Sequence, residues 1–485
     1  MQQDVLGSKW FAFLSFTLLF ITVVLFAYTG KYILLAAPVG FLFILLMMLN
    51  WKLAYWILLF SIPFSFDLDI VSGSLSTSIP DEPIVWLFLL LFSLIWARRP
   101  GILPQWWWRN AIVLVIVLQF VWTAVAVGFS TETLFSVKFL LSKTWMLVSF
   151  FILPLFIFRD KKDLRTGFLV LLVPLIATML IILYRHSKIG FSFAKIQRAI
   201  DPLYYNHVDY STVMSMFFPL LFVAYSLCRG KWLLRNLLIL LIIFFAVAIY
   251  LTYARAAMIA VLFSLIIYLA IRLRMVKWVM PTIYGLMAAL LIFMISNKEY
   301  MVYRPNFNET YMHKTFTEHM IATIRGKDMS SMERLYRWVA GVRMSTDRPI
   351  TGYGPGAFYY NYKPYAVTSF RTYVSRNTEK STTHNYFLFM LVEQGWPAML
   401  LYAILMMLLF AQAQKIYYRF HDRFYKKCTL GIAMFLAAAF INNFFSELYE
   451  THKVGALFYM AIALLVILDK KSRDEEKEHN AISAH

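Results

Sequence analysis

Long apolar segments alternate with short polar ones along almost the whole chain. Three clear apolar segments are Phe11–Tyr28, Leu237–Tyr253 and Val279–Ile295. Each is about 15–22 residues long, the length of an α-helix that crosses the hydrocarbon core of a bilayer. Because lipid offers no partners to backbone N–H and C=O groups, such segments must form helices rather than open strands. The pattern therefore predicts an all-α polytopic membrane protein.

The first of these segments, Phe11–Tyr28, is expected to be retained as a helix. It is longer than the apolar region of a typical signal peptide, and no clear small-x-small cleavage site follows it. It leads directly into the next apolar run, which starts at Ile33.

Lysine and arginine residues are concentrated in every second connection between the apolar segments. Since cytoplasmic connections carry an excess of these residues, the alternation places both termini in the cytoplasm and predicts about 12–14 transmembrane helices. The run Lys52–Pro63 is the weakest of these helices. The basic connections assigned to the cytoplasm are Ala97–Arg109, Arg159–Arg165, Arg229–Arg235, Arg272–Lys277 and Lys415–Lys427.

One long polar connection divides the helices into two blocks. Residues 1–296 form the first block, which includes a smaller outer loop at 185–210. Residues 297–383 form a large outer loop, in which we expect short helices. Residues 384–469 form the C-terminal transmembrane helices, and residues 470–485 form a charged cytoplasmic tail.

The composition agrees with a membrane protein and excludes several classes of function. Of the residues, 61% are hydrophobic and only 15% are charged, whereas a soluble domain has about half and a quarter. The net charge of +20 is spread over both sides of the membrane, so we expect no nucleic-acid partner. The sequence contains no P-loop, no HExxH motif and no histidine or cysteine spacing typical of a metal site. We therefore expect neither a cofactor nor a metal ion; the alternative is a site with Asp201 and Asp209 as ligands, which requires distant segments to converge.

The two long outer connections, Arg185–Tyr210 and Asn297–Thr383, are basic although the topology does not require it. Attraction of single lysines and arginines to anionic lipid headgroups explains such charge. The alternative explanation is a site for an anionic amphiphile with its head at the membrane surface, such as a polyprenyl diphosphate.

One part of the large loop has the pattern of an ordered helix. Ser330 or Ser331 can cap its start, and the helix must end before Pro349. Arg334 and Trp338 share one face, because residues four apart are neighbours on a helix. Arg334 is interpreted either as an arginine snorkelling from a helix on the bilayer surface or as a bidentate phosphate donor.

Three other arginines lie near the predicted membrane surface. On the loop helix, Arg337 and Arg343 point away from the face of Arg334 and are predicted to be solvated. Arg255 interrupts an apolar stretch, in a tight outer turn or just inside the helix that follows. An arginine so close to hydrocarbon is costly without a partner or water, so Arg255 is a candidate site residue.

The loop helix and the helix after it together resemble the signature region of the O-antigen ligase and polymerase superfamily. In that family an arginine four residues before a tryptophan opens a periplasmic helix. A Pro-x-x-Gly-x-Gly turn follows, and a His-Asn pair begins a membrane helix that contains Glu-x-Gly. The matching residues here are Arg334, Trp338, Pro349, Gly352, Gly354, His384, Asn385, Glu393 and Gly395, and the segments at Asn206 and Arg255 resemble the upstream pattern.

The resemblance implies a GT-C-like fold and a glycosyltransferase in the bacterial inner membrane, with its active site facing the periplasm. Members of the family take a glycan from an undecaprenyl diphosphate carrier and pass it to an acceptor hydroxyl. In O-antigen ligases the acceptor is the lipid A–core of lipopolysaccharide, and in polysaccharide polymerases it is another carrier-linked glycan. The resemblance favours a ligase, with a polymerase as the alternative.

The resemblance also implies roles for single residues. His384 would act as the general base toward the acceptor hydroxyl. Arg255 and Arg334 would bind the diphosphate and stabilise its growing charge as the glycosidic bond breaks. If His384 only positions the acceptor, the base is sought among Asp201, Asp209 and Glu393. Supporting roles fall to Asn206, Trp338, Gly352, Gly354, Asn385 and Glu393.

A lipid-linked glycan transporter is the alternative from another class of protein. It would share the number of helices and the arginine near the membrane. It would not need one long structured outer loop, and transporters usually contain repeat-related halves. No such repeat is visible in the sequence.

Overall fold

The computed structural model describes residues 36–71, 75–301, 328–367 and 382–483, together with a few isolated positions. The first apolar segment, Phe11–Tyr28, lies almost entirely outside the described residues. The chain divides into two units, Met1–Ser61 and Ile62–His485. All the site residues discussed below belong to the second unit.

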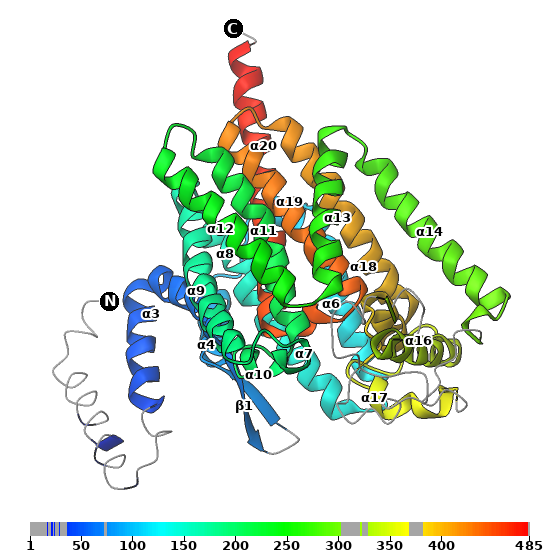
Figure 1. Ribbon diagram of the computed structural model, residues 1–485. Coiled ribbons are helices and arrows are strands. Elements are labelled where there is room, and N and C mark those ends of the chain that lie inside the picture. Colours follow the sequence, from blue (N-terminus) through cyan, green and yellow to red (C-terminus); the bar gives the residue numbers. More distant parts are fainter. Residues whose placement is uncertain are drawn as a thin grey trace. The chain divides into compact units, whose positions relative to one another are not determined.

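Helices make up nearly all of the described structure (Figure 1). The long helices are α3 (Ala36–Ser61), α4 (Asp81–Arg98), α6 (Ala111–Gly128), α7 (Thr133–Leu147), α9 (Lys161–Lys188), α11 (His207–Leu227), α12 (Trp232–Leu251), α13 (Arg255–Arg272), α14 (Val276–Ser296), α16 (Met329–Asp347), α18 (Tyr386–Arg419), α19 (Arg423–Phe444) and α20 (His452–Ser483). The shorter elements are α5 (Gln105–Trp108), η3 (Val148–Ile152), α8 (Pro154–Ile157), α10 (Ile196–Ile200), α17 (Phe358–Asn361), η6 (Lys363–Tyr365), η8 (Leu448–Glu450) and the antiparallel strands β1 (Phe66–Val71) and β2 (Leu75–Ile79).

Eleven helical stretches in the described part of the chain are long and apolar enough to cross a membrane. The prediction of an all-α polytopic membrane protein is confirmed. α4 is 18 residues long and carries charges at its two ends. Lys52–Pro63 does not form a span of its own, because its helical residues continue α3 through a kink at Asn50. α20 runs on to Ser483, so the charged tail continues the last membrane helix.

In the unit Ile62–His485, contacts bring the basic connections together at one end of the helical bundle. Lys161 forms an ion pair with Asp422, and Lys427 donates to the carbonyl of Ser226 at 2.6 Å. At the same end, Tyr418 donates to the carbonyl of Arg272 at 2.7 Å. β1, α10, α16 and α17 lie at the opposite end, away from the C-terminus (Figure 1). The alternation of basic and other connections in the sequence therefore corresponds to the two ends of the bundle.

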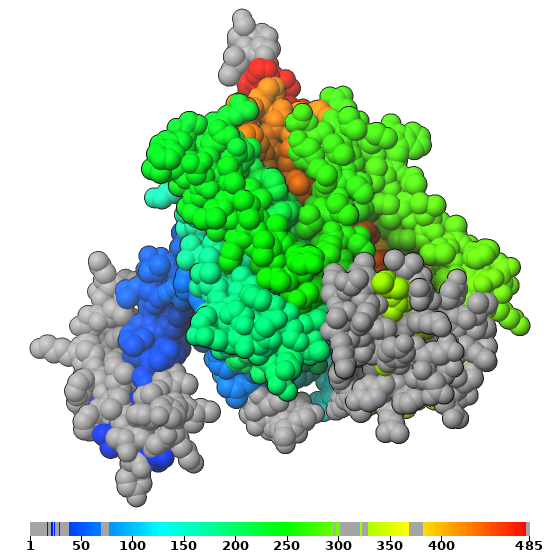
Figure 2. Space-filling model, in the orientation of Figure 1, coloured from blue at the N-terminus to red at the C-terminus, as the bar shows by residue number. Residues whose placement is uncertain are grey.

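α19 forms the centre of this bundle and packs against α11, α13, α18 and α20. Its residues Ala433 and Ala437–Ala439 are fully buried. Such small side chains let helix backbones approach closely, which is how membrane helices associate without a hydrophobic driving force between them. In Figure 2, α19 is visible as an orange strip between the green surfaces of the helices beside it.

Candidate functional site

α16 is the helix that the sequence predicted after Ser330 or Ser331. It begins two or three residues earlier, because the side chain of Asp328 accepts from the amide of Ser331 and caps the helix. Capping by Ser330 or Ser331 was therefore a wrong prediction. The helix ends at Asp347, before Pro349, as predicted.

The Pro-x-x-Gly-x-Gly turn after α16 packs directly on a kink in α18. At the kink Gly395 has a φ of 78°, and the amide of Trp396 donates to the carbonyl of Pro349 at 2.9 Å. The amide of Gly354 in turn donates to the carbonyl of Glu393 at 2.9 Å. A Cβ on Gly352 would lie 2.4 Å from the carbonyl carbon of Glu393. The glycines of the two motifs are thus required by one backbone-to-backbone contact.

Glu393 completes this contact with its side chain. It is fully buried, and its two carboxylate oxygens accept from the amides of Gly356 at 2.7 Å and Phe358 at 3.2 Å. It lies about nine residues into α18 from His384, or roughly 13 Å along the helix. Glu393 therefore supports the loop and lies away from His384.

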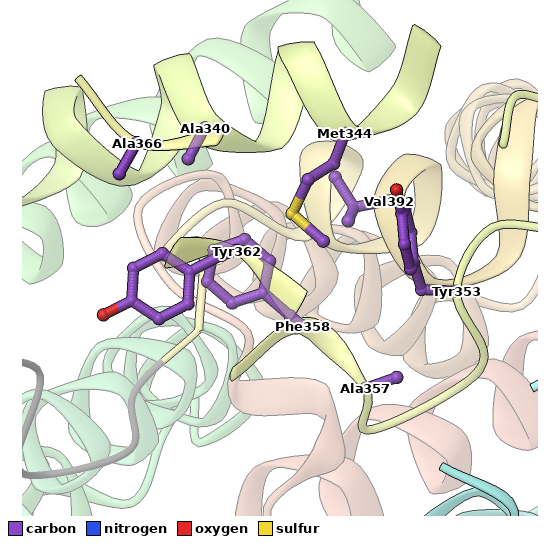
Figure 3. Close-up of a cluster of buried hydrophobic side chains, with 8 residues drawn as sticks. All are labelled: Ala340, Met344, Tyr353, Ala357, Phe358, Tyr362, Ala366 and Val392. Atoms are coloured by element: carbon purple, nitrogen blue, oxygen red, sulfur yellow. The ribbon is translucent and has the colours of Figure 1, made fainter. Parts of the chain in front are cut away.

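A buried apolar cluster holds the other side of the same loop (Figure 3). Its members come from α16, from the loop after it and from α18, and several are aromatic. They are Ala340, Met344, Tyr353, Ala357, Phe358, Tyr362, Ala366 and Val392. α16, the loop and the first half of α18 consequently form one packed body.

Replacing Gly395 with alanine should disrupt this body. The new Cβ would lie 1.9 Å from the carbonyl oxygen of Ile350, and the positive φ alone costs an L-residue about 1–3 kcal/mol. We expect a clearly lowered thermal midpoint of the purified protein. Gly285→Ala is the control, because this glycine lies within α14 with open space around its Cβ position. Equal midpoints for the two variants would contradict the packing described here.

His384 stands at the point where α16 meets the start of α18. Asn385 caps α18 by accepting from the amide of Leu388, and it donates to the carbonyl of Phe444. Trp338 donates to the carbonyl of Thr383 at 2.9 Å, so the tryptophan of the Arg-x-x-x-Trp motif ties α16 to the residue before His384. His384 itself has a φ of 52°, a left-handed conformation that is uncommon outside glycine and concentrates at functional sites.

Arg337 is buried against His384, which corrects the prediction that it is solvated. Only 1% of its side chain is exposed. Its Nη1 lies 3.1 Å from Nε2 of His384 and donates to the carbonyl of Thr382 at 3.1 Å. Arg337 also pairs with Glu333 one turn earlier on α16. Both sides of α16 are covered, so helical periodicity could not show that this arginine is enclosed. Arg343 is exposed, as predicted.

Two carboxylates flank the imidazole of His384. Oε1 of Glu333 lies 3.8 Å from Nε2, and Oε1 of Glu447 lies 3.7 Å from Nδ1. Since an arginine only donates, Nε2 accepts from Arg337 and a neutral ring carries its hydrogen on Nδ1, toward Glu447. The carboxylates can stabilise the imidazolium that forms when the ring takes a proton.

A second network, of hydrogen bonds to Glu450, holds the segment that carries Glu447. Glu450 accepts from Nζ of Lys143 at 2.7 Å and from the hydroxyl of Tyr386 at 2.6 Å. Lys143 belongs to α7 and Tyr386 opens α18. These two helices thereby hold η8 in place, and with it the residue that faces Nδ1 of His384.

The two arginines predicted to bind diphosphate lie beside this histidine cluster. Arg255 is the first residue of α13, and its Nη2 lies 3.1 Å from Oδ2 of Asp328. Arg334 donates to the carbonyl of Phe445 at 3.4 Å and to the side chain of Ser330. Since Phe445 is two residues before Glu447, α13, α16 and the connection after α19 converge here.

Charge in the cluster is balanced among the described residues. Three cations (Arg255, Arg334 and Arg337) stand with three carboxylates (Asp328, Glu333 and Glu447). Burial alone would raise the pKa of Glu333, but the nearby His384 and the charge of Arg337 outweigh it and lower that pKa. Similarly, burial opposes ionisation of Asp328, and Arg255 and Ser331 lower its pKa. Both acids are therefore ionised.

Arg334 is the cation of the cluster whose charge is least compensated by a paired carboxylate, since Arg255 pairs with Asp328 and Arg337 with Glu333. Burial and the nearby charge of Arg255 both lower its pKa, although Glu333, Asp328 and Glu447 act in the opposite direction. A guanidinium stays protonated under such strain. An anion between Arg255 and Arg334 would compensate for the lost hydration of Arg334 and for the repulsion between the two guanidinium groups. This part of the cluster is therefore suited to bind a phosphate group.

Two other predicted residues, Asn206 and Gly354, support the fold at a distance from His384. Asn206 caps α11 by accepting from the amide of Asp209 at 2.8 Å. A Cβ on Gly354 would meet the side chain of Ser130 before α7 at 2.0 Å, so this glycine lets the loop rest on that segment. Of the alternative bases, Asp209 accepts from the hydroxyl of Thr451 at 3.3 Å, and the carbonyl of Asp201 accepts from Arg185 at 2.7 Å.

Four residues of the cluster were not predicted, namely Asp328, Glu333, Arg337 and Glu447. Glu333 and Arg337 are four residues apart on α16, a spacing that signals a helical ion pair. For Asp328 and Glu447 the sequence offers no comparable signal, because each meets its partner across a long separation in the chain.

Comparison with known proteins agrees with this geometry. No curated protein matches the chain. Residues 237–403 match the family model described as O-antigen ligase. The matched range contains Arg255, α16, the glycine turn and His384, whereas Glu447 lies outside it. Over this range the chain is therefore similar to the O-antigen ligase family.

Proposed function

We propose that the protein transfers a glycan from a polyprenyl diphosphate, undecaprenyl diphosphate in bacteria, to an acceptor hydroxyl at the outer face of the inner membrane. The family consists of glycosyltransferase-like enzymes. The observation that carries the proposal is the convergence of His384, Arg255 and Arg334 at one end of the bundle, where α13 and α18 begin. A lipid carrier reaches this point from the membrane, and a sugar reaches it from water.

In the proposed reaction the acceptor oxygen attacks the anomeric carbon of the donor glycan. The bond from that carbon to the diphosphate oxygen breaks, and its electron pair stays on the diphosphate. Arg255 and Arg334 stabilise this leaving group, because its charge grows in the transition state. We assign this role to the two guanidiniums rather than to a metal ion, since they form bidentate bonds with phosphate.

His384 accepts the proton that the acceptor hydroxyl loses. The lone pair of the neutral ring is on Nε2, where Arg337 donates. When the acceptor binds, its hydroxyl must replace this hydrogen bond or share Nε2 with Arg337. Glu447 and Glu333 then face the protonated ring from both sides. The proton leaves to water when the product departs, so no further reactant is needed.

The proposal is tested by transfer in proteoliposomes that contain only this protein. A glycan linked to undecaprenyl diphosphate is supplied as donor, and lipid A–core or a second donor molecule as acceptor. Formation of the ligated or elongated glycan supports a transferase. Movement of the intact donor across the membrane without any transfer would instead support a transporter.

We favour an O-antigen ligase over a polymerase, and the cell's lipopolysaccharide profile after deletion separates the two. If the protein is a ligase, the whole O-antigen ladder disappears and carrier-linked polymer accumulates. If it is a polymerase, a band with a single repeat persists. The partners implied in the first case are the undecaprenyl diphosphate donor, lipid A–core and the surrounding lipids.

Glu447→Gln should slow transfer while leaving donor binding unchanged. The substitution keeps the size of the side chain and removes the charge 3.7 Å from Nδ1 of His384. We expect a roughly 10–100-fold loss of rate, less than for a fully buried triad carboxylate, because the residue is partly exposed to water. The fall of the rate toward acidic pH should also move to lower pH, because the imidazolium has lost a stabilising neighbour. An unchanged pH profile would remove Glu447 from the mechanism.

Both termini and the basic connections are proposed to be cytoplasmic, and the large loop periplasmic. A single cysteine introduced at Lys363 should react with an impermeant thiol reagent in intact spheroplasts. One introduced at Arg423 should react only after permeabilisation. The reverse pattern would overturn the topology and the outer-face mechanism together.

A further inference from the structure

A groove with a volume of about 520 Å³ lies at the end of the bundle that carries the basic connections. Its walls come from α9, α11, α12, α19 and α20. The volume falls within the range of about 300–1,000 Å³ that is usual for ligand sites in proteins. His384 lies at the opposite end, so the groove is not part of the site described above.

The groove is apolar along its length and charged at one end only. Most of its lining residues are leucine, phenylalanine and other apolar side chains. Its charged lining residues are Arg165 and Lys231, and no carboxylate lines it among the residues that the structure describes. Both cations belong to basic connections at the ends of membrane helices. The groove is therefore complementary to an amphiphile that has an anionic head and an apolar chain.

The depth of the groove matches one leaflet of a bilayer. On α12 its lining extends from Lys231 to Leu241, or roughly 15 Å at the rise of an α-helix. The hydrocarbon core of a bilayer is about 30 Å thick, so the groove ends near the middle. A phospholipid of the leaflet on the basic side would fill it from headgroup to chain end.

Neither Arg165 nor Lys231 forms an ion pair with a carboxylate in the part of the chain that the structure describes, and the nearby carboxylates have other partners. Asp422 pairs with Lys161 and accepts from the amides of Phe424 and Tyr425. Asp163 accepts from the amides at the start of α9. The guanidinium of Arg165 stacks 5.0 Å from the ring centre of Phe424, which holds it at the mouth.

We propose that this groove binds one phospholipid with an anionic headgroup, such as phosphatidylglycerol. Its phosphate lies between Arg165 and Lys231, and an acyl chain lies in the groove between α9 and α12. Basic pockets between transmembrane helices on the cytoplasmic side are suited to such headgroups. The chain would cover apolar surface of α12, a span with few residues buried in the protein itself. The bound lipid thereby stabilises the folded protein by mass action.

Native mass spectrometry of the delipidated, full-length protein tests the proposal. Phosphatidylglycerol and phosphatidylcholine with the same dioleoyl chains are titrated separately, and undecaprenyl phosphate is titrated in a third arm. We expect one phosphatidylglycerol to bind more tightly than phosphatidylcholine. In Arg165→Gln/Lys231→Gln the affinity for phosphatidylglycerol should fall roughly fivefold per removed cation, since each contributes about 1 kcal/mol.

Two further variants fix the location. Ala224→Trp fills the groove from α11 and should abolish binding of the single lipid. Arg98→Gln/Arg99→Gln removes two exposed cations at the end of α4, outside the groove, and should leave binding unchanged. If Ala224→Trp does not fold, the charge variants decide the question alone.

Three results would overturn the proposal. Equal affinity for the two phospholipids would show that the headgroup charge is not recognised. An equal loss in the Arg98/Arg99 and Arg165/Lys231 variants would indicate a diffuse surface charge. Displacement of phosphatidylglycerol by undecaprenyl phosphate at equal concentration would identify the occupant as a carrier lipid instead.

Discussion

Replacing His384 with alanine should reduce glycan transfer by about 10²–10⁴-fold, the usual cost of removing an acid–base group. The substitution leaves Arg255 and Arg334 in place, so binding of the lipid diphosphate donor should persist. Transfer and donor binding are measured in parallel with the reconstituted protein. The wild-type rate should also fall at acidic pH, because a protonated ring cannot accept the acceptor's proton, and this fall should vanish in the variant.

His384→Gln separates a basic role from a positioning role. Glutamine retains much of the hydrogen-bonding reach of the ring but none of its basicity, so the variant should be nearly as inactive as alanine. His421→Ala is a matched control, because this exposed histidine lies in a basic connection at the other end of the bundle. Near-normal turnover of His384→Gln would show that the ring only positions the acceptor. The base would then be sought first in Glu447 or Glu333, which lie closest to it.

The sequence was sufficient for the class of fold. Apolar segments of membrane-spanning length specify helices almost without regard to packing, because lipid leaves the backbone no other choice. The spacing of Arg334 and Trp338 alone placed them on one face of a helix. Trp338 donates to the carbonyl of Thr383, directly before His384, and Arg334 donates to the carbonyl of Phe445.

What the sequence could not predict depends on contacts between distant segments. Arg337 was predicted to be solvated because periodicity shows which residues share a face but not which faces are covered. α16 began earlier than expected because Asp328 both caps it and pairs with Arg255, 73 residues away in the chain. The role of Glu393 in the family motif was open for the same reason, since the amides that it accepts from lie in the preceding loop.

The second large effect is expected at the two arginines of the proposed diphosphate site. Arg255→Ala or Arg334→Ala should each lower transfer by about 10²–10³-fold, the cost of removing one donor that stabilises developing charge. Donor affinity should fall as well, in contrast to His384→Ala. Lysine should restore little activity at either position, because a point charge does not reproduce the planar fork of a guanidinium. Arg343→Ala serves as the control on the same helix, since this arginine is exposed and donates to the carbonyl of Tyr365 at 3.3 Å.

The double variant Arg255→Ala/Arg334→Ala distinguishes one shared anion from two separate effects. If both guanidiniums hold the same diphosphate, removal of the first already loosens it, and the second substitution costs less than it does alone. The same coupling should be absent between Arg343→Ala and either substitution. Strict additivity of the Arg255 and Arg334 effects on donor affinity would mean that they do not share a ligand. In that case the low pKa of Arg334 reflects burial and repulsion from Arg255 without a substrate between them.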